Sequence, residues 1–320
     1  MTSVVALAGG VGAGKFLRGL VAVVSPEDLT VVVNTADDIR VHGLHVSPDV
    51  DSVTYWLAGV ADRERGWGRA GETFRTTEEL REFGADDAWF GLGDLDLATH
   101  LVRTRLLNEG KTLGEATWVV AARFGIRARI LPMSNDRVTT RVAVAGAGGE
   151  ILDLHFQEYW VKRGARDEVK SIRFDGAERA APSEGVLDAI RSADAVLVCP
   201  SNPVASIAPI LAIPGIREAV AEKRAMAVGV SPIVGGAPVR GMADKLLPVY
   251  GVDVSAAGAA SCYEGLIRGW VIDDVDASLA PGIERAGFDV MVAQTMMVDD
   301  EAAERLARVT LDLALKGGRG

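Results

Sequence analysis

The sequence predicts an α/β fold: a doubly wound, mostly parallel, Rossmann-like sheet that carries an inserted antiparallel hairpin and a helical lobe. Residues 4–8 and 29–33 are short runs of mostly apolar residues, and residues 16–23, which follow a run of glycines after the first of them, are predicted to form a helix. A strand, a helix and a strand at this spacing form the repeating unit of a parallel sheet. Because both runs are almost entirely apolar, we expect helices on both faces of the sheet.

The remaining elements follow from hydrophobic spacing and turn residues. In chain order they are helices at 51–61 and 112–124, an antiparallel hairpin of 138–144 with 151–161, a helix at 183–192, strands at 195–199 and 226–230, and a helix at 300–315. We expect a single domain over 1–320. Its body would comprise 1–135 and 183–320, and its hairpin insertion 136–182.

The composition indicates a folded protein with an acidic surface. Lys and Arg total 34 against 44 Asp and Glu, and the formal net charge of −10 disfavours nucleic acid and anionic membranes as partners. An anionic substrate would then be held by backbone N–H groups, a metal ion or a few selected cations. Two cysteines, no basic leader and no apolar run of transmembrane length favour a cytoplasmic protein, and a homodimer is the default oligomer.

A glycine cluster, residues 9–14, separates the first strand from the first helix and ends at Lys15. Backbone amides at such a turn can bind phosphate oxygens, which makes Gly10, Gly12 and Lys15 candidate ligands. The cluster is not a Walker A site, because Phe16 replaces the Ser or Thr that holds magnesium, and Lys15 also breaks the dinucleotide fingerprint. The alternative is that the glycines serve only a tight turn.

Carboxylates gather after the second strand, at the edge of the sheet where ligands of open α/β proteins bind. Asn34, Asp37 and Asp38 come first, and Asp49 and Asp51 follow. Oxygen ligands of this kind suit Mg²⁺ bridging to a diphosphate. Alternatively, Asp49 or Asp51 caps the next helix and the earlier pair forms a solvated turn.

Other polar and aromatic side chains are placed where they could bind a ligand. His100 and Arg103 share a helical face at a spacing of three residues, so both could point at one acidic group. Ser134, the pair Ser201 and Asn202, and the pair Gly235 and Gly236 each follow a strand, although each loop alone could be an ordinary turn. The aromatic stretch 156–160 could stack on a flavin-like ring or pack in the hairpin core.

Together these segments resemble the CofD family, the 2-phospho-L-lactate transferases and their actinobacterial counterparts. The motifs that carry the resemblance span most of the chain up to about residue 250. They are Gly9-Gly10-Val11-Gly12 with Lys15, Asn34-Thr35-Ala36-Asp37-Asp38, Ser47-Pro48-Asp49-Val50-Asp51, Gly93-Asp94-Leu95-Asp96 with His100 and Arg103, Pro132-Met133-Ser134, residues 156–161, Pro200-Ser201-Asn202-Pro203, and residues 231–236. The family often has a Lys-Gly pair after the last motif, whereas this chain has Arg240-Gly241.

The resemblance implies transfer of a phospholactyl or phosphoenolpyruvyl group from a guanosine diphosphate donor to the ribityl hydroxyl of Fo, a deazariboflavin, with release of GMP, in coenzyme F-420 biosynthesis. It implies three sets of site residues. Asp51, Asp49 and His100 would be catalytic, with Asp49 and Asp51 holding Mg²⁺. Substrate or nucleotide would bind Gly10, Gly12, Lys15, Asn34, Asp37, Arg103, Ser134, Ser201, Asn202, Gly235 and Gly236, and Fo would bind Tyr55, Trp56, Phe156 and Trp160.

Two other functions compete with this one. A CofD-like protein of the gluconeogenesis-factor type would bind a nucleotide sugar as a regulator without catalysing transfer. A P-loop-like kinase is disfavoured by Phe16. The sequence leaves the choice between a lactyl and an enolpyruvyl donor open.

Overall fold

The computed structural model describes residues 2–146 and 148–318, and its centre is one parallel sheet of seven strands. The order across the sheet is β14-β13-β10-β9-β1-β2-β5. Every neighbouring pair is parallel. The strands are β1 (Val4–Ala8), β2 (Leu29–Val33), β5 (Arg129–Pro132), β9 (Ala195–Val198), β10 (Ala227–Val230), β13 (Gly269–Ile272) and β14 (Asp289–Val292).

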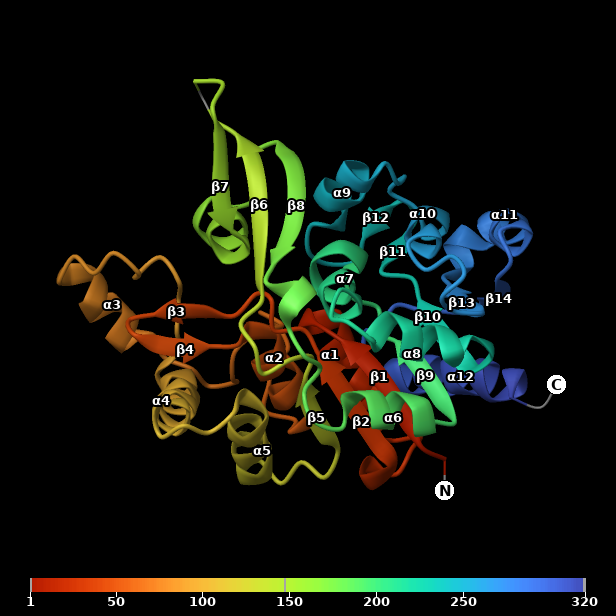
Figure 1. The fold of residues 1–320 in the computed structure, drawn as a ribbon, viewed down its shortest axis with the longest axis horizontal. Helices are drawn as coiled ribbons and strands as arrows, with labels where there is room; N and C mark the ends of the chain where they lie inside the picture. Colours follow the sequence, from red (N-terminus) through yellow and green to blue (C-terminus); the bar gives the residue numbers. More distant parts are fainter. Residues whose placement is uncertain (1, 147, 319–320) are drawn as a thin grey trace.

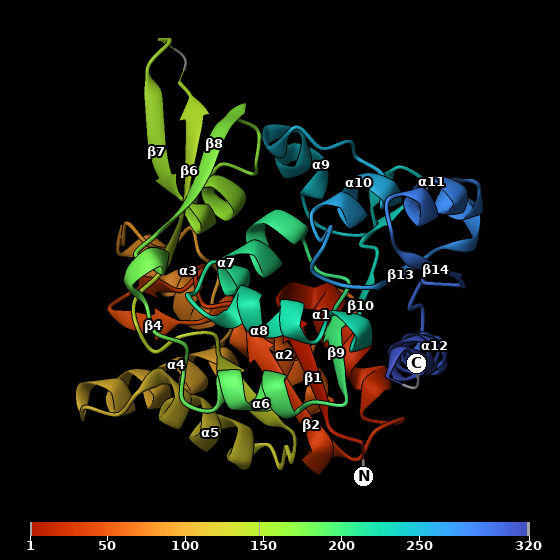
Figure 2. The ribbon, with the colours of Figure 1, turned by 45° about the vertical axis from the view of Figure 1, so that its right-hand side comes forward.

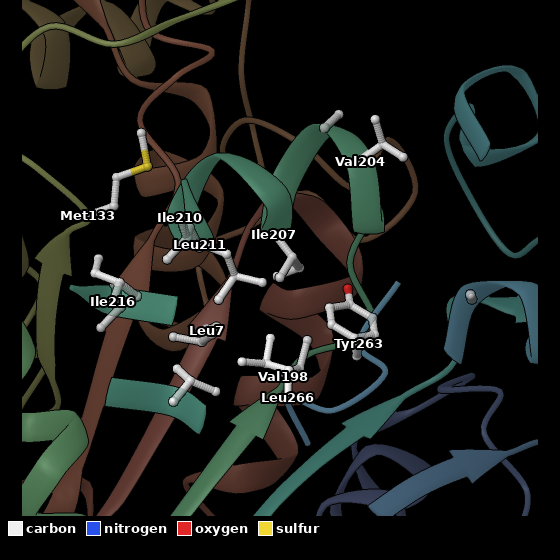
Figure 3. Close-up of a cluster of buried hydrophobic side chains, with 14 of the residues drawn as sticks. Leu7, Met133, Val198, Val204, Ile207, Ile210, Leu211, Ile216, Tyr263 and Leu266 are labelled. Carbon is white, nitrogen blue, oxygen red and sulfur yellow. The ribbon is translucent and has the colours of Figure 1, made fainter. Parts of the chain in front are cut away.

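Helices cover both faces, as the apolar strands predict. Val4, Ala6 and Ala8 of β1 belong to one buried cluster, whereas Val5 and Leu7 belong to another on the opposite face. The first face is covered by α1 (Gly10–Leu20), α2 (Pro48–Leu57) and α12 (Asp300–Gly317). The second is covered by α6 (Val186–Ser192), α7 (Ala208–Leu211) and α8 (Ile216–Glu222). Figure 3 shows Ile210 and Leu211 of α7 and Ile216 of α8 in the same buried cluster as Leu7 of β1 and Val198 of β9. The doubly wound α/β prediction is confirmed.

Two additions extend the body, as Figure 1 and Figure 2 show. One is the helical lobe, which contains α3 (Arg75–Glu82), α4 (Asp94–Asn108) and α5 (Leu113–Arg123), beside the small hairpin of β3 (Ile39–Val41) and β4 (Leu44–Val46). The other is an antiparallel sheet in the order β7-β6-β8, which stands away from the body. Its strands are β6 (Thr139–Ala145), β7 (Ile151–His155) and β8 (Val169–Asp175).

Three local predictions were wrong in detail. The helix at 51–61 begins earlier, at Pro48, and the first helix begins inside the glycine cluster, at Gly10. The strand at 151–161 ends at His155, because Gln157 N–H donates to His155 Nδ1 and His155 N–H donates to the Glu158 carboxylate, which turns the chain into a π-helix, Glu158–Lys162. The hairpin also gains a third strand, β8, which the sequence analysis missed.

The other described elements are short. They are β11 (Ile233–Val234), β12 (Ala237–Pro238), α9 (Ala243–Leu246), α10 (Ala256–Ser261), α11 (Ala280–Arg285), the π-helix Pro203–Ile207, and the 3-10 helices Pro26–Asp28, Ala177–Arg179, Arg224–Met226, Leu247–Tyr250 and Asp274–Leu279. Among the described residues no single helix is both long and apolar enough to cross a membrane, although the bent pair Pro203–Leu211 and Ile216–Glu222 meets that criterion by length and composition.

Candidate active site

The strand order reverses between β1 and β9, and the loops after these two strands meet. From β1 the chain continues to β2 on one side, whereas β9 continues to β10 on the other. Ser201 Oγ, after β9, donates to the Gly9 carbonyl at 2.9 Å and accepts from Gly9 N–H at 3.3 Å. Ligands of open α/β sheets bind at such a reversal, outside the carboxyl ends of the strands.

The glycine cluster is packed tightly against its neighbours. A Cβ atom at Gly12 would lie 2.2 Å from the Pro200 carbonyl oxygen, and one at Gly14 would lie 2.5 Å from the Trp56 ring. Gly9 has similar contacts with Asp49 and Ser206. Close packing alone therefore explains these glycines, and a role for Gly10 and Gly12 in binding phosphate stays a prediction.

Two buried carboxylates lie at this edge without a cationic partner among the described residues. Asn34 Nδ2 donates to Asp49 Oδ2 at 2.9 Å, and Asp37 Oδ1 has no hydrogen-bond partner in the described chain. Burial raises the pKa of Asp49 to about 7, and the nearby charge of Asp38 adds to the rise. Burial, then the charge of Asp49, raises the pKa of Asp37 well above its usual value. The site therefore concentrates carboxyl groups for which the described residues supply no cation.

Neither of the two alternatives for these acids holds: Asp49 and Asp51 do not cap the helix, and Asp37 and Asp38 do not form a solvated turn. The N-cap position of α2 is Ser47, and its hydroxyl donates to Asp38 Oδ1 at 2.7 Å instead of capping the helix. Asp49 and Asp51 lie inside the first turn, where the helix dipole favours negative charge. Asp37 is buried, and the Asp38 carboxylate is bonded to the His45 ring and the Ser47 hydroxyl with only 11% of its side chain exposed, so the two do not form a solvated turn.

Asp51 differs from Asp49, because it is neutralised. Its Oδ2 accepts a hydrogen bond of 2.9 Å from Arg103, and its Oδ1 accepts a second, so the guanidinium and carboxylate form a two-point ion pair. The Arg103 side chain has no solvent exposure, and Asp51 has 6%. The structure thus brings Asp51 and Arg103 together, although the sequence analysis assigned them separate roles.

His100 lies in the middle of the same buried network. Its Nδ1 is 3.7 Å from Asp51 Oδ2, and its Nε2 is 3.4 Å from Asp96 Oδ1. Asp96 also accepts a hydrogen bond from Tyr55 Oη. Asp96 was not among the predicted site residues, although its position four residues before His100 on α4 places both on one helical face.

The other predicted binding residues are mostly engaged by the protein itself. Ser134 Oγ donates to the Ala181 carbonyl at 2.6 Å, and Gly235 N–H donates to Asp276 Oδ2 at 3.0 Å. Asn202 Oδ1 accepts from Val204 and Ala205 N–H and so caps the following π-helix. Gly236 follows Gly235 in the turn between β11 and β12. These bonds support the ordinary-turn alternative for Ser134 and Asn202.

Of the four aromatic candidates for Fo binding, Trp160 is the one with a substantially exposed side chain. Phe156 is part of the hydrophobic core, and Tyr55 is buried against Phe124 with ring centroids 5.7 Å apart. Trp56 is buried too and donates from Nε1 to the Gly66 carbonyl at 3.1 Å. Trp160 is 38% exposed, on the π-helix.

Comparisons with known proteins agree on a family. The model of the family described as 2-phospho-L-lactate transferase CofD matches residues 4–315. A phosphoenolpyruvate transferase of Streptomyces griseus subsp. griseus is 51% identical and covers 97% of this chain and 98% of its own. A phosphoenolpyruvate transferase of Mycolicibacterium smegmatis is 41% identical and covers 96% of this chain and 97% of its own. A 2-phospho-L-lactate transferase of Methanosarcina mazei is 39% identical and covers 95% of this chain and 97% of its own.

A crystal structure of a UPF0052 family member from Bacillus halodurans has the same fold, with a TM-score of 0.62 at 18% identity over 97% of this chain and 98% of that one. The match of the family model over nearly the whole length, together with identities well above those needed to establish kinship, leads to one conclusion. The chain belongs to the CofD family and is an enzyme of that group of transferases.

Proposed function

We propose that the enzyme transfers a phosphoenolpyruvyl group from a guanosine diphosphate donor to the ribityl hydroxyl of Fo, in coenzyme F-420 biosynthesis. The observation that carries the proposal is the 51% identity to a phosphoenolpyruvate transferase over nearly the full length of both chains. An enolpyruvyl donor is favoured over a lactyl donor, because the relatives of 41–51% identity carry that name and the lactate transferase is more distant.

In this reaction the acceptor oxygen attacks the phosphorus that bears the enolpyruvyl ester. A new P–O bond forms, the bond from that phosphorus to the bridging oxygen breaks, and GMP leaves with the electron pair while the hydroxyl loses its proton. Phosphoryl transfer of this kind needs mainly positioning and neutralisation of charge. The loops after β1, β2 and β9 meet at the sheet edge, so a long ligand there would contact several of them.

Asp37 and Asp49 fit a magnesium ion better than Asp49 and Asp51 do. Asp37 has a buried oxygen without a partner, and both acids have raised pKa values, whereas both oxygens of Asp51 are bonded to Arg103. One or two carboxylates plus substrate phosphates are a usual ligand set for Mg²⁺, which would neutralise the charge of the diphosphate. We therefore propose Asp49 with Asp37 as the metal ligands.

A carboxylate with a pKa near 7 could also accept the proton of the ribityl hydroxyl. Because a bound metal ion would lower this pKa, Asp49 is a candidate base only as the alternative to being a candidate ligand. His100 is less suited to contact a substrate, because its ring is 1% exposed and lies between Asp51 and Asp96.

The test is incubation of the protein with Fo, Mg²⁺ and each donor, enolpyruvyl- or lactyl-diphospho-5′-guanosine, followed by mass analysis. We expect dehydro coenzyme F-420 without glutamates, and GMP in equal amount, from the enolpyruvyl donor. A protein that binds a nucleotide sugar, leaves the Fo absorbance unchanged and forms no product would instead be the regulator of the gluconeogenesis-factor type.

A further inference from the structure

Asn34 is the first residue after β2, and its side chain is completely buried. Its Nδ2 donates to Asp49 Oδ2 at 2.9 Å and to the Ala205 carbonyl at 3.4 Å, and its Oδ1 accepts from Ala36 N–H at 2.9 Å. A side-chain amide has two N–H donors, so both donors of Asn34 are engaged. Asn34 therefore has no donor left for the nucleotide that the family resemblance implies as its ligand.

The hydrogen bonds of Asn34 join three segments of the chain around one carboxylate oxygen. Asp49 lies in the first turn of α2, Ala205 lies in the π-helix that follows β9, and Ala36 lies in the turn after β2. Gly9, directly after β1, closes the other side, because a Cβ atom at this position would lie 2.6 Å from Asp49 Oδ2. The Oδ2 atom of Asp49 is therefore held between the segments that follow β1 and β2.

The other oxygen of this carboxylate, Asp49 Oδ1, is on the side of Gly10, where a Cβ atom would lie 3.8 Å from it. Asp49 as a whole retains 8% exposure. Because the Asn34 amide bonds Oδ2, it determines which of the two oxygens is left for a ligand. Groups that hydrogen-bond a functional carboxylate set its orientation, and their loss lowers activity even though they do not contact the substrate.

We propose that Asn34 is a positioning residue for the transfer reaction: it holds Oδ2 of Asp49 so that Oδ1 remains available to a metal ion or to the acceptor hydroxyl. The inference rests on the proposed function for what Asp49 does in the reaction. It reassigns Asn34, which acts through Asp49 and does not bind the nucleotide. If this is correct, Asn34 has no influence on catalysis once the carboxylate at position 49 is absent.

The first experiment is a kinetic double-mutant cycle on the wild type, Asn34→Asp, Asp49→Asn and the double variant. Asn34→Asp keeps an acceptor for Ala36 N–H but removes the donor to Asp49, so kcat should fall roughly ten- to a hundredfold. The KM for Fo should change less than about twofold. In the Asp49→Asn background the same change should lower kcat less than about twofold, because the two residues act as a unit. Asn34→Ala, which adds no charge, should give the same pattern.

The second experiment, urea denaturation of the same four proteins, does not depend on activity. Asn34→Asp places two carboxylates in contact and should lower the urea concentration at half unfolding. The double variant exchanges the amide and the acid, so the amide at position 49 can donate to the carboxylate at position 34, and most of the loss should be recovered. Asn135→Asp is the matched control for both experiments. Asn135 Oδ1 accepts from Gly114 N–H at 2.9 Å in an exposed loop, and this variant should keep the wild-type kcat and stability.

Three outcomes would overturn the positioning role. They are an equal loss of kcat on changing Asn34 in both backgrounds, a higher KM for the donor at unchanged kcat, as a nucleotide-binding residue would give, and an equal loss in Asn135→Asp. The failure of the proposed function is a separate result. If the wild type converts no guanosine donor but the exchanged pair recovers stability, the function is wrong and the contact between Asn34 and Asp49 stands. If the enolpyruvyl donor is converted but the exchange recovers nothing, the positioning role is wrong and the function stands.

Discussion

Asp49 and Asp51 are two residues apart on the first turn of one helix, both are buried, and their surroundings are opposite. Asp51 has a complete partner in Arg103, which itself is fully buried. Asp49 has an amide donor, Asn34, and its pKa is raised by burial and then by the charge of Asp38. A buried charge that is already paired contributes to the structure, whereas one that is left unpaired indicates where a ligand binds.

The largest expected effect is on stability, when the buried pair of Asp51 and Arg103 is broken. Arg103→Met leaves Asp51 as an uncompensated buried charge, so the free energy of unfolding should fall by about 3–5 kcal/mol. Urea denaturation measures this fall in the free energy of unfolding. The double variant Asp51→Leu with Arg103→Met removes both charges and should recover most of the loss. A single variant within about 1 kcal/mol of the wild type would contradict the assignment of this pair as structural.

At Asp49, the unpaired acid, we expect a substitution to lower activity and not stability. Asp49→Asn keeps the shape and an acceptor for Asn34, but removes the charge available to a metal ion or a proton, so kcat should fall at least roughly a hundredfold. Unfolding should need as much urea as in the wild type or more, because a repulsive charge is gone. Asp51→Asn is the contrast: it weakens the partner of Arg103 and should lower stability. Normal turnover by Asp49→Asn would contradict the assignment of Asp49 as the functional acid of the two.

The pH dependence of stability tests the assignment of Asp49. Because the pKa of Asp49 is raised to about 7 in the folded protein, this residue binds more protons folded than unfolded between its usual pKa and 7. Its contribution is therefore favourable at low pH, is lost as the pH rises toward 7 and is constant above it. Mg²⁺ should raise the melting temperature more at pH 8 than at pH 5, because the metal binds the ionised form. Equal shifts at both values, or no change of the shift in Asp49→Asn, would contradict the metal assignment.

The sequence predicted the parallel sheet and the edge where the site lies, because apolar strands and the residues that follow them are local patterns. Residues such as Asp37 and Asp49 could be placed at that edge for the same reason. The pairing of Asp51 with Arg103 could not be predicted, since it joins residues 52 positions apart on separate helices. Phe156 shows a further limit: an aromatic residue after a strand has the same local pattern whether it faces a ligand or, as here, the core.

The smallest expected effect on catalysis is at His100, and it tests which side of the comparison this residue belongs to. The ring lies between Asp51 and Asp96 and is 1% exposed, so it contacts the neutralised pair and not the unpaired carboxylates. His100→Gln keeps one hydrogen-bonding group near each acid, and we expect a loss of about 1–3 kcal/mol in stability from the group left unsatisfied, with kcat reduced less than about tenfold. Parallel urea denaturation and steady-state kinetics measure both. If kcat instead fell a hundredfold at unchanged stability, His100 would have to reach the reacting groups, and the network of Asp51, Arg103 and Asp96 would be part of the catalytic site.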